Sequence, residues 1–315
     1  MNPAMTVHTI DTGYAGQSGF AAAYRITEGD QVTFVETNTS RAVPRLLASL
    51  EEVGRSPEDV AFIIVTHVHL DHAGGAGVLA AHCPRAMVLA HPRAVPHLVD
   101  PDKLVTSAKG VYGEVAFAEF YGEVWPIPAE RVRAMGDEEE LVFGARRLRF
   151  LHTAGHANHH VCIHDSATNG IFTGDSFGIA YPRLQTRGLR IFPTTTPTDF
   201  DARAYQATVR RIAELAPSRV YLTHYGELQE VAEAARSLDE QLEAYAALVE
   251  DADQPQYDEA AVEQRCREQV EAFFAALFDE EQRAAGAELL KLDLDLNAQG
   301  VAFAVKKRRF KRGAS

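Results

Sequence analysis

The stretch "AFIIVTHVHLDHAGG", residues 61–75, places three histidines and an aspartate within six positions, directly behind an apolar run. In an extended chain the side chains of His67 and His69 project to the same side, because strand side chains alternate with a period of two. Several imidazoles so close together repel one another when protonated and need partners when buried. A shared metal ion removes both problems. The stretch therefore predicts a strand that ends in a metal-binding loop.

The second half of the stretch turns away from the strand. Asp71 and His72 are adjacent in sequence, and neighbouring residues in a turn point in different directions. Gly74, Gly75 and Gly77 allow the backbone to bend closely around an ion, and a carboxylate suits the start of the helix that follows. The spacing thus divides the stretch into one pair of ligands for a first ion and another pair for a second.

Further ligands are needed to complete the coordination of either ion. Three downstream residues qualify, because each follows an apolar strand pattern: His156 comes after "RLRFL", Asp175 after "GIFTG" and His224 after "RVYLT". Side chains at the carboxyl ends of separate strands can converge on one edge of a sheet. We therefore expect these three residues to join the first four.

The composition describes an acidic, globular chain. Of its 315 residues, 46% are hydrophobic and 24% are charged, enough apolar material for one large domain or two smaller ones. The formal net charge is −13, and the tail "KKRRFKR" at residues 306–312 holds six positive charges, so the remaining chain carries −13 − 6 = −19. A chain with this much negative charge repels polyphosphates, which argues against a nucleic-acid partner. For the basic tail we expect a frayed, solvated terminus.

Targeting and redox signals are weak. The N-terminal sequence has no basic segment followed by an apolar one, and no apolar run approaches the roughly 18 residues that span a bilayer. We therefore expect a cytoplasmic protein without a membrane partner. Cys83, Cys162 and Cys266 lie far apart without C-x-x-C spacing, so we expect small buried hydrophobic residues rather than disulfides or a thiolate zinc site.

The order of the apolar segments predicts a layered α/β fold. Residues 93–135, rich in Pro, Gly and Tyr, predict an irregular, substrate-facing insertion. From residue 227 to about residue 290 the sequence is rich in Ala, Glu, Gln and Leu with a break at "DADQPQ", which predicts two or three helices. We divide the chain into a catalytic domain, residues 1–226, and a C-terminal helical region with a basic tail, residues 227–315. The helical region covers a pocket or mediates dimerisation.

With these motifs in order, the chain resembles the metallo-β-lactamase-fold hydrolase superfamily, in its glyoxalase II-like or thioesterase-like branch. The resemblance covers roughly residues 6 to 226 and includes an early aspartate, for which Asp11 is the nearest match. It implies a four-layer αβ/βα sandwich with the metals along one edge. It also implies how the ligands divide: His67, His69 and His156 bind the first metal, Asp71, His72 and His224 bind the second, and Asp175 bridges the two.

This chain departs from the family pattern around the third element, where "AGHANHH" stands in place of the common "PGHTPGH". The change puts Asn158 and His159 beside the predicted metals, and His159 is a candidate for substrate contact, with plain exposure to solvent as the alternative. Tyr181 in "YPRL" is a candidate acid or oxyanion donor. His152, His160 and His164 are expected to be structural, as hydrogen-bond partners behind the ligands.

Two bridged metals activate water and polarise the bond under attack, which predicts hydrolysis of an ester-like centre. Asp71 could orient the nucleophile or receive its proton. The ligand set is compatible with zinc, iron or manganese, and we expect two divalent ions, with zinc favoured.

The bridging Asp175 argues against a true β-lactamase, and the C-terminal helices resemble those of thioesterase-type members. We therefore expect a small-molecule acyl thioester as substrate and a second copy of the chain as a candidate partner. Alternatives are a lactonase or phosphodiesterase on the same site, a mononuclear iron persulfide dioxygenase, and a non-catalytic regulatory or binding protein.

Overall fold

Residues 5–313 are described by a computed structural model, in which the chain forms two compact units. The sheet unit extends to Thr153 and also contains His159–Gly174 and Ala216–Val231. The helical unit contains Ala154–Asn158, Asp175–Leu215 and the chain from Ala232 onward. The functional division at residue 226 stays a prediction.

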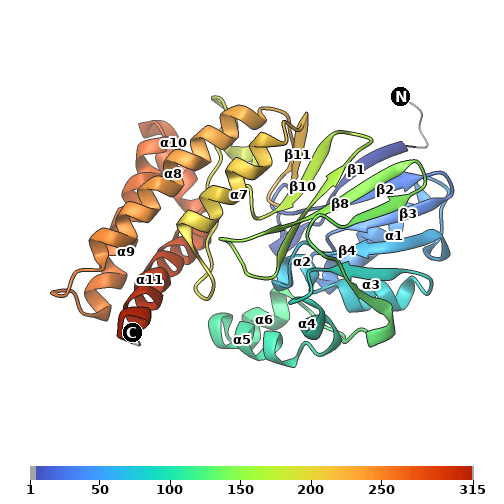
Figure 1. Ribbon diagram of the computed structural model, residues 1–315, viewed down its shortest axis with the longest axis horizontal. Helices are drawn as coiled ribbons and strands as arrows, with labels where there is room; N and C mark the ends of the chain where they lie inside the picture. The colour runs from blue at the N-terminus through green and yellow to red at the C-terminus, as the bar shows by residue number, and fades with distance from the viewer. Residues whose placement is uncertain (1–4, 314–315) are drawn as a thin grey trace. The chain divides into compact units, whose positions relative to one another are not determined.

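Two six-stranded sheets form the core of the sheet unit (Figure 1). The first has the order β1-β2-β3-β4-β5-β6, with β1 to β3 antiparallel and β3 to β6 parallel. Its strands are β1 Met5–Asp11, β2 Ala22–Glu28, β3 Gln31–Val35, β4 Val60–Ile64, β5 Met87–Ala90 and β6 Val132–Ala134.

The second sheet has the order β12-β11-β10-β9-β8-β7, in which the β10–β11 pair is parallel and the other pairs are antiparallel. Its strands are β7 Glu140–Phe143, β8 Arg146–Thr153, β9 His160–Asp165, β10 Gly170–Gly174, β11 Arg219–Leu222 and β12 Gly226–Leu228. Asn169, with φ +46°, is the last residue of the turn between the antiparallel strands β9 and β10.

Helices cover the outer face of the first sheet. Those of the sheet unit are α1 Val43–Glu51, α2 Leu70–Ala73, α3 Ala76–His82, α4 Val95–Val99, α5 Asp102–Tyr112 and α6 Glu114–Phe120. Leu46 of α1 and Leu79 of α3 pack in one apolar cluster with Phe34 and Ile63 of the sheet. A second cluster, with Tyr24, Phe150 and Phe172, draws on both sheets. The parallel strands are therefore buried on both faces, which explains why β4 reads as an unbroken apolar run.

A buried ion triad ties three strands together. Arg146 at the start of β8 has no exposed surface and donates from Nε to Glu28 of β2 at 3.1 Å. Its Nη1 donates to Asp165 at the end of β9 at 2.5 Å. A fully buried guanidinium is tolerated only when its charge is paired and hydrogen-bonded. The triad therefore connects the first sheet to the second.

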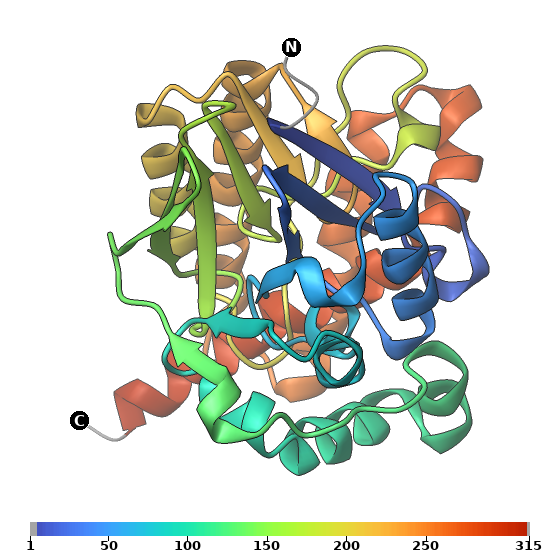
Figure 2. The same ribbon diagram turned by 90° about the vertical axis from the view of Figure 1, so that its right-hand side faces the viewer.

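The predicted irregular insertion at residues 93–135 is wrong for its first part, which is helical. α4, α5 and α6 occupy most of residues 95–120, and Figure 2 shows them as a green row of helices. The proline residues misled the prediction because they lie at helix starts, where proline is tolerated: Pro96 is in the first turn of α4, and Pro101 caps α5. Gly113, with φ +80°, separates α5 from α6.

After α6 the chain contains neither helix nor strand as far as residue 128. Trp125, 44% exposed, lies there and lines a small cavity together with Val68 and Leu70 of the histidine-rich loop. Its backbone carbonyl approaches Gly77 so closely that a Cβ on that glycine would lie 2.0 Å from the oxygen. This part of the insertion therefore packs directly on the loop that carries the predicted ligands.

The helical unit contains α7 Ala202–Glu214, α8 Val231–Ala252, α9 Glu259–Leu277, α10 Glu280–Leu289 and α11 Lys291–Gly313. The predicted helices and the break at residues 251–256 are confirmed, with α8, α9 and α10 before residue 290. Five short 3-10 helices complete the described chain: η1 Tyr14–Gly16, η2 Ser40–Ala42, η3 Pro57–Asp59, η4 Ala129–Arg131 and η5 Pro182–Leu184.

The basic tail is an ordered part of α11, so the expectation of a frayed terminus is wrong for residues 306–312. Asp253, whose side chain is 2% exposed, accepts ion pairs from three arginines of that segment. These are Arg308 at 3.1 Å, Arg309 at 3.2 Å and Arg312 at 2.6 Å. A buried carboxylate needs such partners, and it thereby fixes the end of α11 against the end of α8.

The three cysteines are free and fully buried, as expected. Burial raises the pKa of the Cys83 thiol to about 12 and that of the Cys266 thiol to about 11. Neither forms the thiolate that reacts or binds metal at neutral pH.

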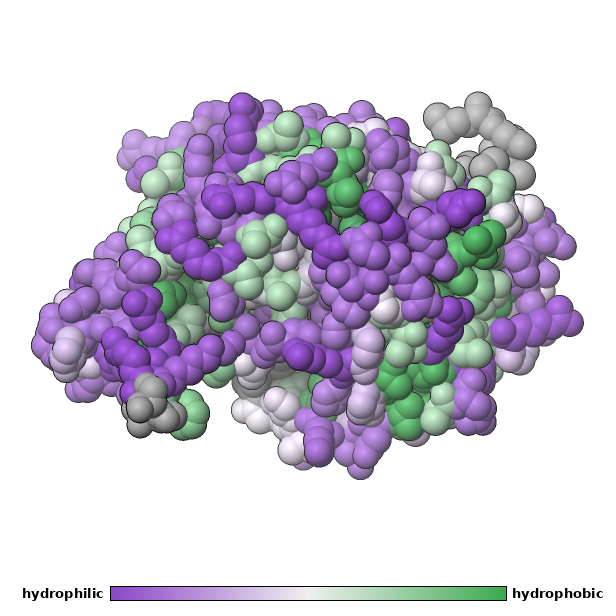
Figure 3. All heavy atoms as spheres, in the orientation of Figure 1, coloured by the Kyte–Doolittle hydropathy of each residue, from purple (hydrophilic) through white to green (hydrophobic). Residues whose placement is uncertain are grey.

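Between residues 5 and 313, none of the helices has both the length and the apolarity to cross a membrane. On the face shown in Figure 3, hydrophilic residues predominate and hydrophobic ones occur in separate patches.

Candidate metal centre

The loop after β4 carries the first predicted ligands. β4 ends at Ile64, and the chain continues without helix or strand, with a bend at Thr66, to His69, which is extended with φ −61° and ψ 144°. His67 is fully buried, and its Nε2 lies 2.8 Å from Nδ1 of His69. The two rings therefore face the same side, as the alternation of an extended chain predicts.

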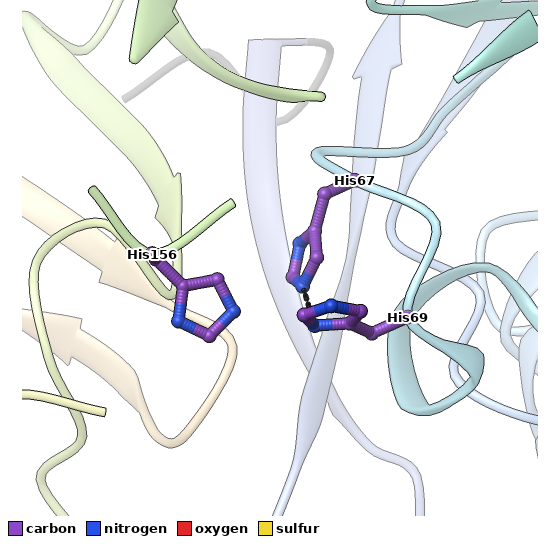
Figure 4. A group of neighbouring side chains, drawn as sticks. All are labelled: His67, His69 and His156. Carbon is purple, nitrogen blue, oxygen red and sulfur yellow. Dashed lines mark hydrogen bonds between the residues drawn. The ribbon is translucent and has the colours of Figure 1, made fainter. Parts of the chain in front are cut away.

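Three groups of potential metal ligands form around this loop. In each group the ligand atoms lie within 4.8 Å of one another, a spacing that one ion can bridge with bonds of about 2.0–2.6 Å. The groups are His67 with His69 and His156, His67 with His72 and Asp175, and Asp71 with His72 and His224. Figure 4 shows the rings of the first group turned toward a common point.

Strand ends supply the three ligands that lie far away in sequence. His156 lies in the short connection between β8 and β9, Asp175 directly follows β10, and His224 comes two residues after β11 ends. These four strands are neighbours in the second sheet, so the places of the three residues are set by the ends of the strands beside them. All seven predicted ligands thus occur in the three groups, and the ion that each one binds stays a prediction.

Three of these imidazoles are held through their Nδ1 atoms. The partners are Glu36 Oε1 for His72 at 3.1 Å, Thr194 O for His156 at 3.0 Å and Phe20 O for His224 at 2.8 Å. A carbonyl or carboxylate oxygen can only accept, so Nδ1 carries the hydrogen and Nε2 keeps its lone pair. This is the arrangement that a metal-binding histidine needs.

His67 is oriented by a short relay. Its Nδ1 lies 3.1 Å from Oγ1 of Thr66, and that hydroxyl donates its hydrogen to Oε1 of Glu36. Thr66 can therefore only accept from His67, so Nδ1 of His67 carries the hydrogen and Nε2 keeps the lone pair that an ion needs. His69, in contrast, faces the group through Nδ1.

Glu36 is the acidic residue behind the ligands that sequence reasoning missed. It follows β3 directly, is 1% exposed, and accepts hydrogen bonds from Thr66, Thr223 and His72. The available signal was "QVTFVE", an apolar strand followed by a carboxylate, which is the pattern that identified Asp175.

Asp11, the nearest sequence match to the early family aspartate, orders its own loop. It accepts from the amides of Gly13 at 3.0 Å and Gly19 at 3.1 Å, and from the hydroxyl of Ser18. Glu36, which follows β3 of the first sheet, hydrogen-bonds to the predicted ligand His72, whereas Asp11 hydrogen-bonds within its own loop.

The segment after Glu36 clamps the ligand loop. Asn38 donates from Nδ2 to the Asp71 carbonyl at 2.8 Å, and its own carbonyl accepts from the Gly75 amide at 2.8 Å. Gly75 has an ordinary φ of −86°, but a Cβ there would lie 2.7 Å from the Thr39 carbonyl. The glycine is therefore required by close packing of two loops rather than by a bend around an ion.

The two carboxylates differ in exposure. Asp175 is 5% exposed, with Oδ2 3.4 Å from Nε2 of His156. The side chain of Asp71 is 26% exposed, with Oδ2 3.4 Å from Nε2 of His224. Asp175 is grouped with His67, a predicted ligand of the first metal, and with His72, a predicted ligand of the second. This is the placement that a bridging ligand requires. Of the two carboxylates, Asp71 is the one more open to solvent.

The donor set as a whole fits divalent ions. It consists of five imidazoles and two carboxylates, and the three cysteines are buried outside it. Imidazole and carboxylate suit zinc, iron and manganese. The oriented Nε2 atoms and the close carboxylate oxygens are what such an ion needs, so the residues fit the metals that the sequence predicts.

His159 and Tyr181 lie in different surroundings. His159 is partly buried, with its ring centroid 5.5 Å from that of His69 and 6.1 Å from that of His67. It stands beside ligands, and its contact with substrate stays a prediction. The Tyr181 hydroxyl lies 3.3 Å from Oδ1 of Asp293 in α11, and its catalytic role also stays a prediction.

The remaining nearby histidines hydrogen-bond to residues outside the predicted ligand set, and their expected role as partners of the ligands stays a prediction. Nδ1 of His160 lies 2.8 Å from Thr153 Oγ1, and its ring stacks on His67 with centroids 4.8 Å apart. His152 pairs with the Met135 carbonyl at 2.8 Å. His164 pairs with Asn169 at 3.1 Å.

Comparisons with curated proteins agree with this geometry. The metallo-β-lactamase fold-containing protein ST1585 of Sulfurisphaera tokodaii is 30% identical over 168 residues, which cover 52% of this chain and 60% of that protein. The acyl-coenzyme A thioesterase MBLAC2 of Homo sapiens is 27% identical over 179 residues, which cover 50% of this chain and 59% of that protein. The chain thus spans about 60% of the length of these relatives.

Solved structures confirm the fold. The crystal structure of ST1585 has a TM-score of 0.68 at 22% identity and covers 95% of this chain and 99% of its own. A metallo-beta-lactamase family protein from Thermus thermophilus has a TM-score of 0.66 at 20% identity, with coverage of 99% and 95%. The predicted α/β sandwich with C-terminal helices is therefore correct. Residues 10–224 match the model of one family, and the chain accordingly belongs to the metallo-beta-lactamase superfamily.

Proposed function

We propose that this protein is a hydrolase that uses two divalent metal ions to cleave a small-molecule acyl thioester. The observation that carries the proposal is the fixed orientation of the imidazoles. His72, His156 and His224 each engage an acceptor through Nδ1 and present Nε2 to a carboxylate or to another ligand. Histidines with a purely structural role have no need of this common arrangement.

Ions bound there would supply a Lewis acid for the carbonyl and an activated water molecule. The protein fixes the positions of the side chains that act together with the ions. Asp71, partly exposed beside His224, is placed to orient the attacking water and receive its proton. His159, beside His67 and His69, is the candidate for contact with the leaving group or the acyl group.

The choice of a thioester is supported by the relatives and by charge. One curated relative is named an acyl-coenzyme A thioesterase, and the chain matches about 59% of its length. The net charge of −13 disfavours long polyanions such as nucleic acids. Zinc is the ion we propose, and the cytoplasmic location and the homodimer stay predictions.

Metal analysis of protein purified without added metal tests the site, and a panel of an acyl-coenzyme A, a lactone and a phosphodiester tests the reaction. We expect two zinc ions per chain and turnover of the thioester. His72→Ala should remove one ion and lower kcat/KM at least about 100-fold, because even the residues that only support a ligand contribute about 10- to 100-fold to metal affinity or activity. His8→Ala is the matched control, since the His8 side chain is 49% exposed.

Hydrolysis of the phosphodiester or lactone without any thioester turnover would refute the choice of substrate. One iron per chain, with oxygen uptake in the presence of glutathione persulfide, would favour the dioxygenase instead.

A further inference from the structure

The chain between η5 and α7 contains the segment "PTTT", residues 193–196, which contacts the predicted ligand His156 in two places. The Thr194 carbonyl accepts the hydrogen of His156 Nδ1 at 3.0 Å. The Thr196 hydroxyl donates to the backbone carbonyl of His156 at 3.2 Å. The segment therefore holds both the ring and the backbone of this residue.

The helix α11 holds the segment in turn. Asn297 accepts from the Thr195 amide through Oδ1 at 2.8 Å and donates from Nδ2 to the Pro193 carbonyl at 3.0 Å. The Thr195 hydroxyl shares its hydrogen between the carbonyls of Leu296 at 3.1 Å and Asn297 at 3.2 Å. Asn297 thus binds the segment on both sides of Thr194.

A glycine further along α11 makes room for the same segment. A Cβ on Gly300 would lie 2.6 Å from Cβ of Thr195 and 3.0 Å from the Thr196 carbonyl oxygen. Residues three positions apart share one face of a helix, so Asn297 and Gly300 together form a cradle for the segment. Asparagine and glycine are poor helix formers. Their place inside the 23-residue helix α11 is explained by this contact rather than by helix stability.

The polar groups of this cradle are buried. Thr195 is 2% exposed and Asn297 is 4% exposed, and Nδ2 of Asn297 also lies 3.4 Å from the hydroxyl of Tyr245 in α8. Because a buried polar group is costly to leave without a partner, these contacts favour one orientation of the Asn297 amide. All of these residues, with His156, belong to the helical unit. The position of the Thr194 carbonyl is therefore set within one compact unit.

We propose that Asn297 is a positioning residue of the metal centre. Through Pro193 and Thr195 it fixes the Thr194 carbonyl, and this carbonyl fixes the ring of His156 with Nε2 available to the ion. The inference rests on His156 as a metal ligand, which is part of the function proposed above. It assigns to the C-terminal helix a task that is separate from covering a pocket or mediating dimerisation.

A double-mutant cycle on the full-length protein separates positioning from general stability. Chelator competition measures the zinc affinities of the parent, Asn297→Ala, His156→Ala and the double variant. We expect Asn297→Ala to weaken the binding of one ion about tenfold, the lower end of the effect of residues that support a ligand. In the His156→Ala background the ring is absent, so the same change should alter the affinity of the remaining ion less than twofold.

Gln206→Ala is the matched control, because it also removes a buried amide from a helix of the helical unit. Gln206 is buried in α7, and its Nε2 donates to the Asp239 carbonyl at 3.2 Å. Its loss should lower the unfolding temperature of the metal-free protein but leave the zinc affinities within twofold of the parent values.

Gly300→Ala is a second variant, which keeps every hydrogen-bonding group of the cradle and introduces a better helix former. Its methyl group displaces Thr195, so zinc affinity should fall at least about threefold although the helix itself is not weakened. If Asn297→Ala does not fold, as judged by circular dichroism, Gly300→Ala takes its place in the cycle with His156→Ala.

Three results would overturn the proposal: unchanged zinc affinities in Asn297→Ala and Gly300→Ala, an equal loss in Gln206→Ala, and a loss in the His156→Ala background as large as in the parent. The last result would show that Asn297 supports the fold rather than His156. A parent protein that binds no metal would refute the proposed function and this inference together. A parent that binds two ions but hydrolyses no thioester would refute only the choice of substrate, and the zinc affinities would still decide on Asn297.

Discussion

Glu36 connects three residues around the metal centre through one carboxylate. Its Oε1 accepts from His72 Nδ1 at 3.1 Å and from Thr223 at 3.2 Å, and Thr66 donates to the same oxygen while accepting from His67. Glu36 itself is held at a left-handed φ of +67°, a conformation that non-glycine residues seldom adopt. A single buried side chain thus orients two predicted ligands, His67 of the first predicted metal set and His72 of the second.

Glu36→Gln should weaken metal binding about 10- to 100-fold. The glutamine keeps the shape but offers one acceptor oxygen without a charge, so the hydrogen of His72 is held less firmly. Competition with a chromogenic chelator measures the affinity. Glu52→Gln, at a side chain that is 60% exposed, is the control and should leave the affinity unchanged. Equal affinities in the two variants would show that Glu36 does not support the ligands.

Residue-level prediction succeeded where the spacing itself carried information. The H-x-H-x-D-H stretch identified four ligands, because alternation in a strand fixes where side chains point. Glu36 was missed because its importance comes from contacts with Thr66 and Thr223, of which the second is 187 positions away. The strand-end pattern "QVTFVE" marks Glu36 as a candidate, but it does not show which side chains Glu36 contacts.

The sheets depend on the pairing between β2, β8 and β9 at the element scale. Arg146 sits among Glu28 and Asp165 with no access to water. Asp165 also accepts from Thr168 Oγ1 at 2.7 Å, so its carboxylate has partners on two sides. The triad is therefore a buried network, and loss of the Arg146 cation leaves two buried carboxylates without a positive partner.

Arg146→Met should lower the free energy of unfolding by about 3–5 kcal/mol, the usual cost of breaking a buried ion pair from one side. Arg147→Met is a closely matched control, because the adjacent Arg147 has a 65% exposed side chain and pairs at the surface with Glu140. It should cost less than about 1 kcal/mol. Urea unfolding of both variants checks the difference, and similar losses would mean that the triad does not stabilise the sheets.

Prediction of elements was correct where periodicity was strong. The strands before the ligands follow from their apolar patterns, and the helices after residue 227 follow from the composition of that segment. α4 to α6 were missed because proline at a helix start and proline in a loop look alike in sequence. The order of α11 was missed because Asp253, its anchor, lies in another helix.

The pH response of the whole molecule should include a contribution from His91. This residue follows β5 and is 8% exposed, and its Nδ1 accepts from the Arg93 amide at 2.9 Å. Burial, with the nearby His152, His159 and Arg93, lowers its pKa to about 4. The unfolded chain has the ordinary histidine pKa of about 6.5. Between these values the unfolded state binds a proton that the folded state does not, so stability falls as the pH falls from about 6.5 to about 4.

In His91→Asn this contribution should be absent, so the free energy of unfolding should fall less steeply between pH 6.5 and pH 4.5. The difference in slope from the parent protein approaches one proton, or about 1.4 kcal/mol per pH unit. The other histidines are common to both proteins, so the difference isolates His91. Guanidinium unfolding at four pH values measures it. His8→Asn, at an exposed side chain, should keep the parent slope, and an unchanged slope in His91→Asn would contradict the assignment.

At the scale of the whole molecule, the sequence predicted the fold class and the cluster of histidines and aspartates that fits a metal site. Both depend on strand ends that meet at one sheet edge. It did not reveal the hydrogen bonds that join Asn297 to residues 193–195, because they connect positions that are 102 and 104 residues apart. The composition shows that the tail is basic, but charge alone does not show which surface the helix α11 packs against.

The packing of Trp125 against Val68 and Leu70 provides an optical reporter. It is the single tryptophan of the chain, so intrinsic fluorescence excited at the red edge comes from one known position. Trp125 lies beside the loop that holds His67, His69, Asp71 and His72, because it lines one cavity with Val68 and Leu70 of that loop. Loading and removal of ions can therefore be followed by emission in real time, on unmodified protein and without an added dye.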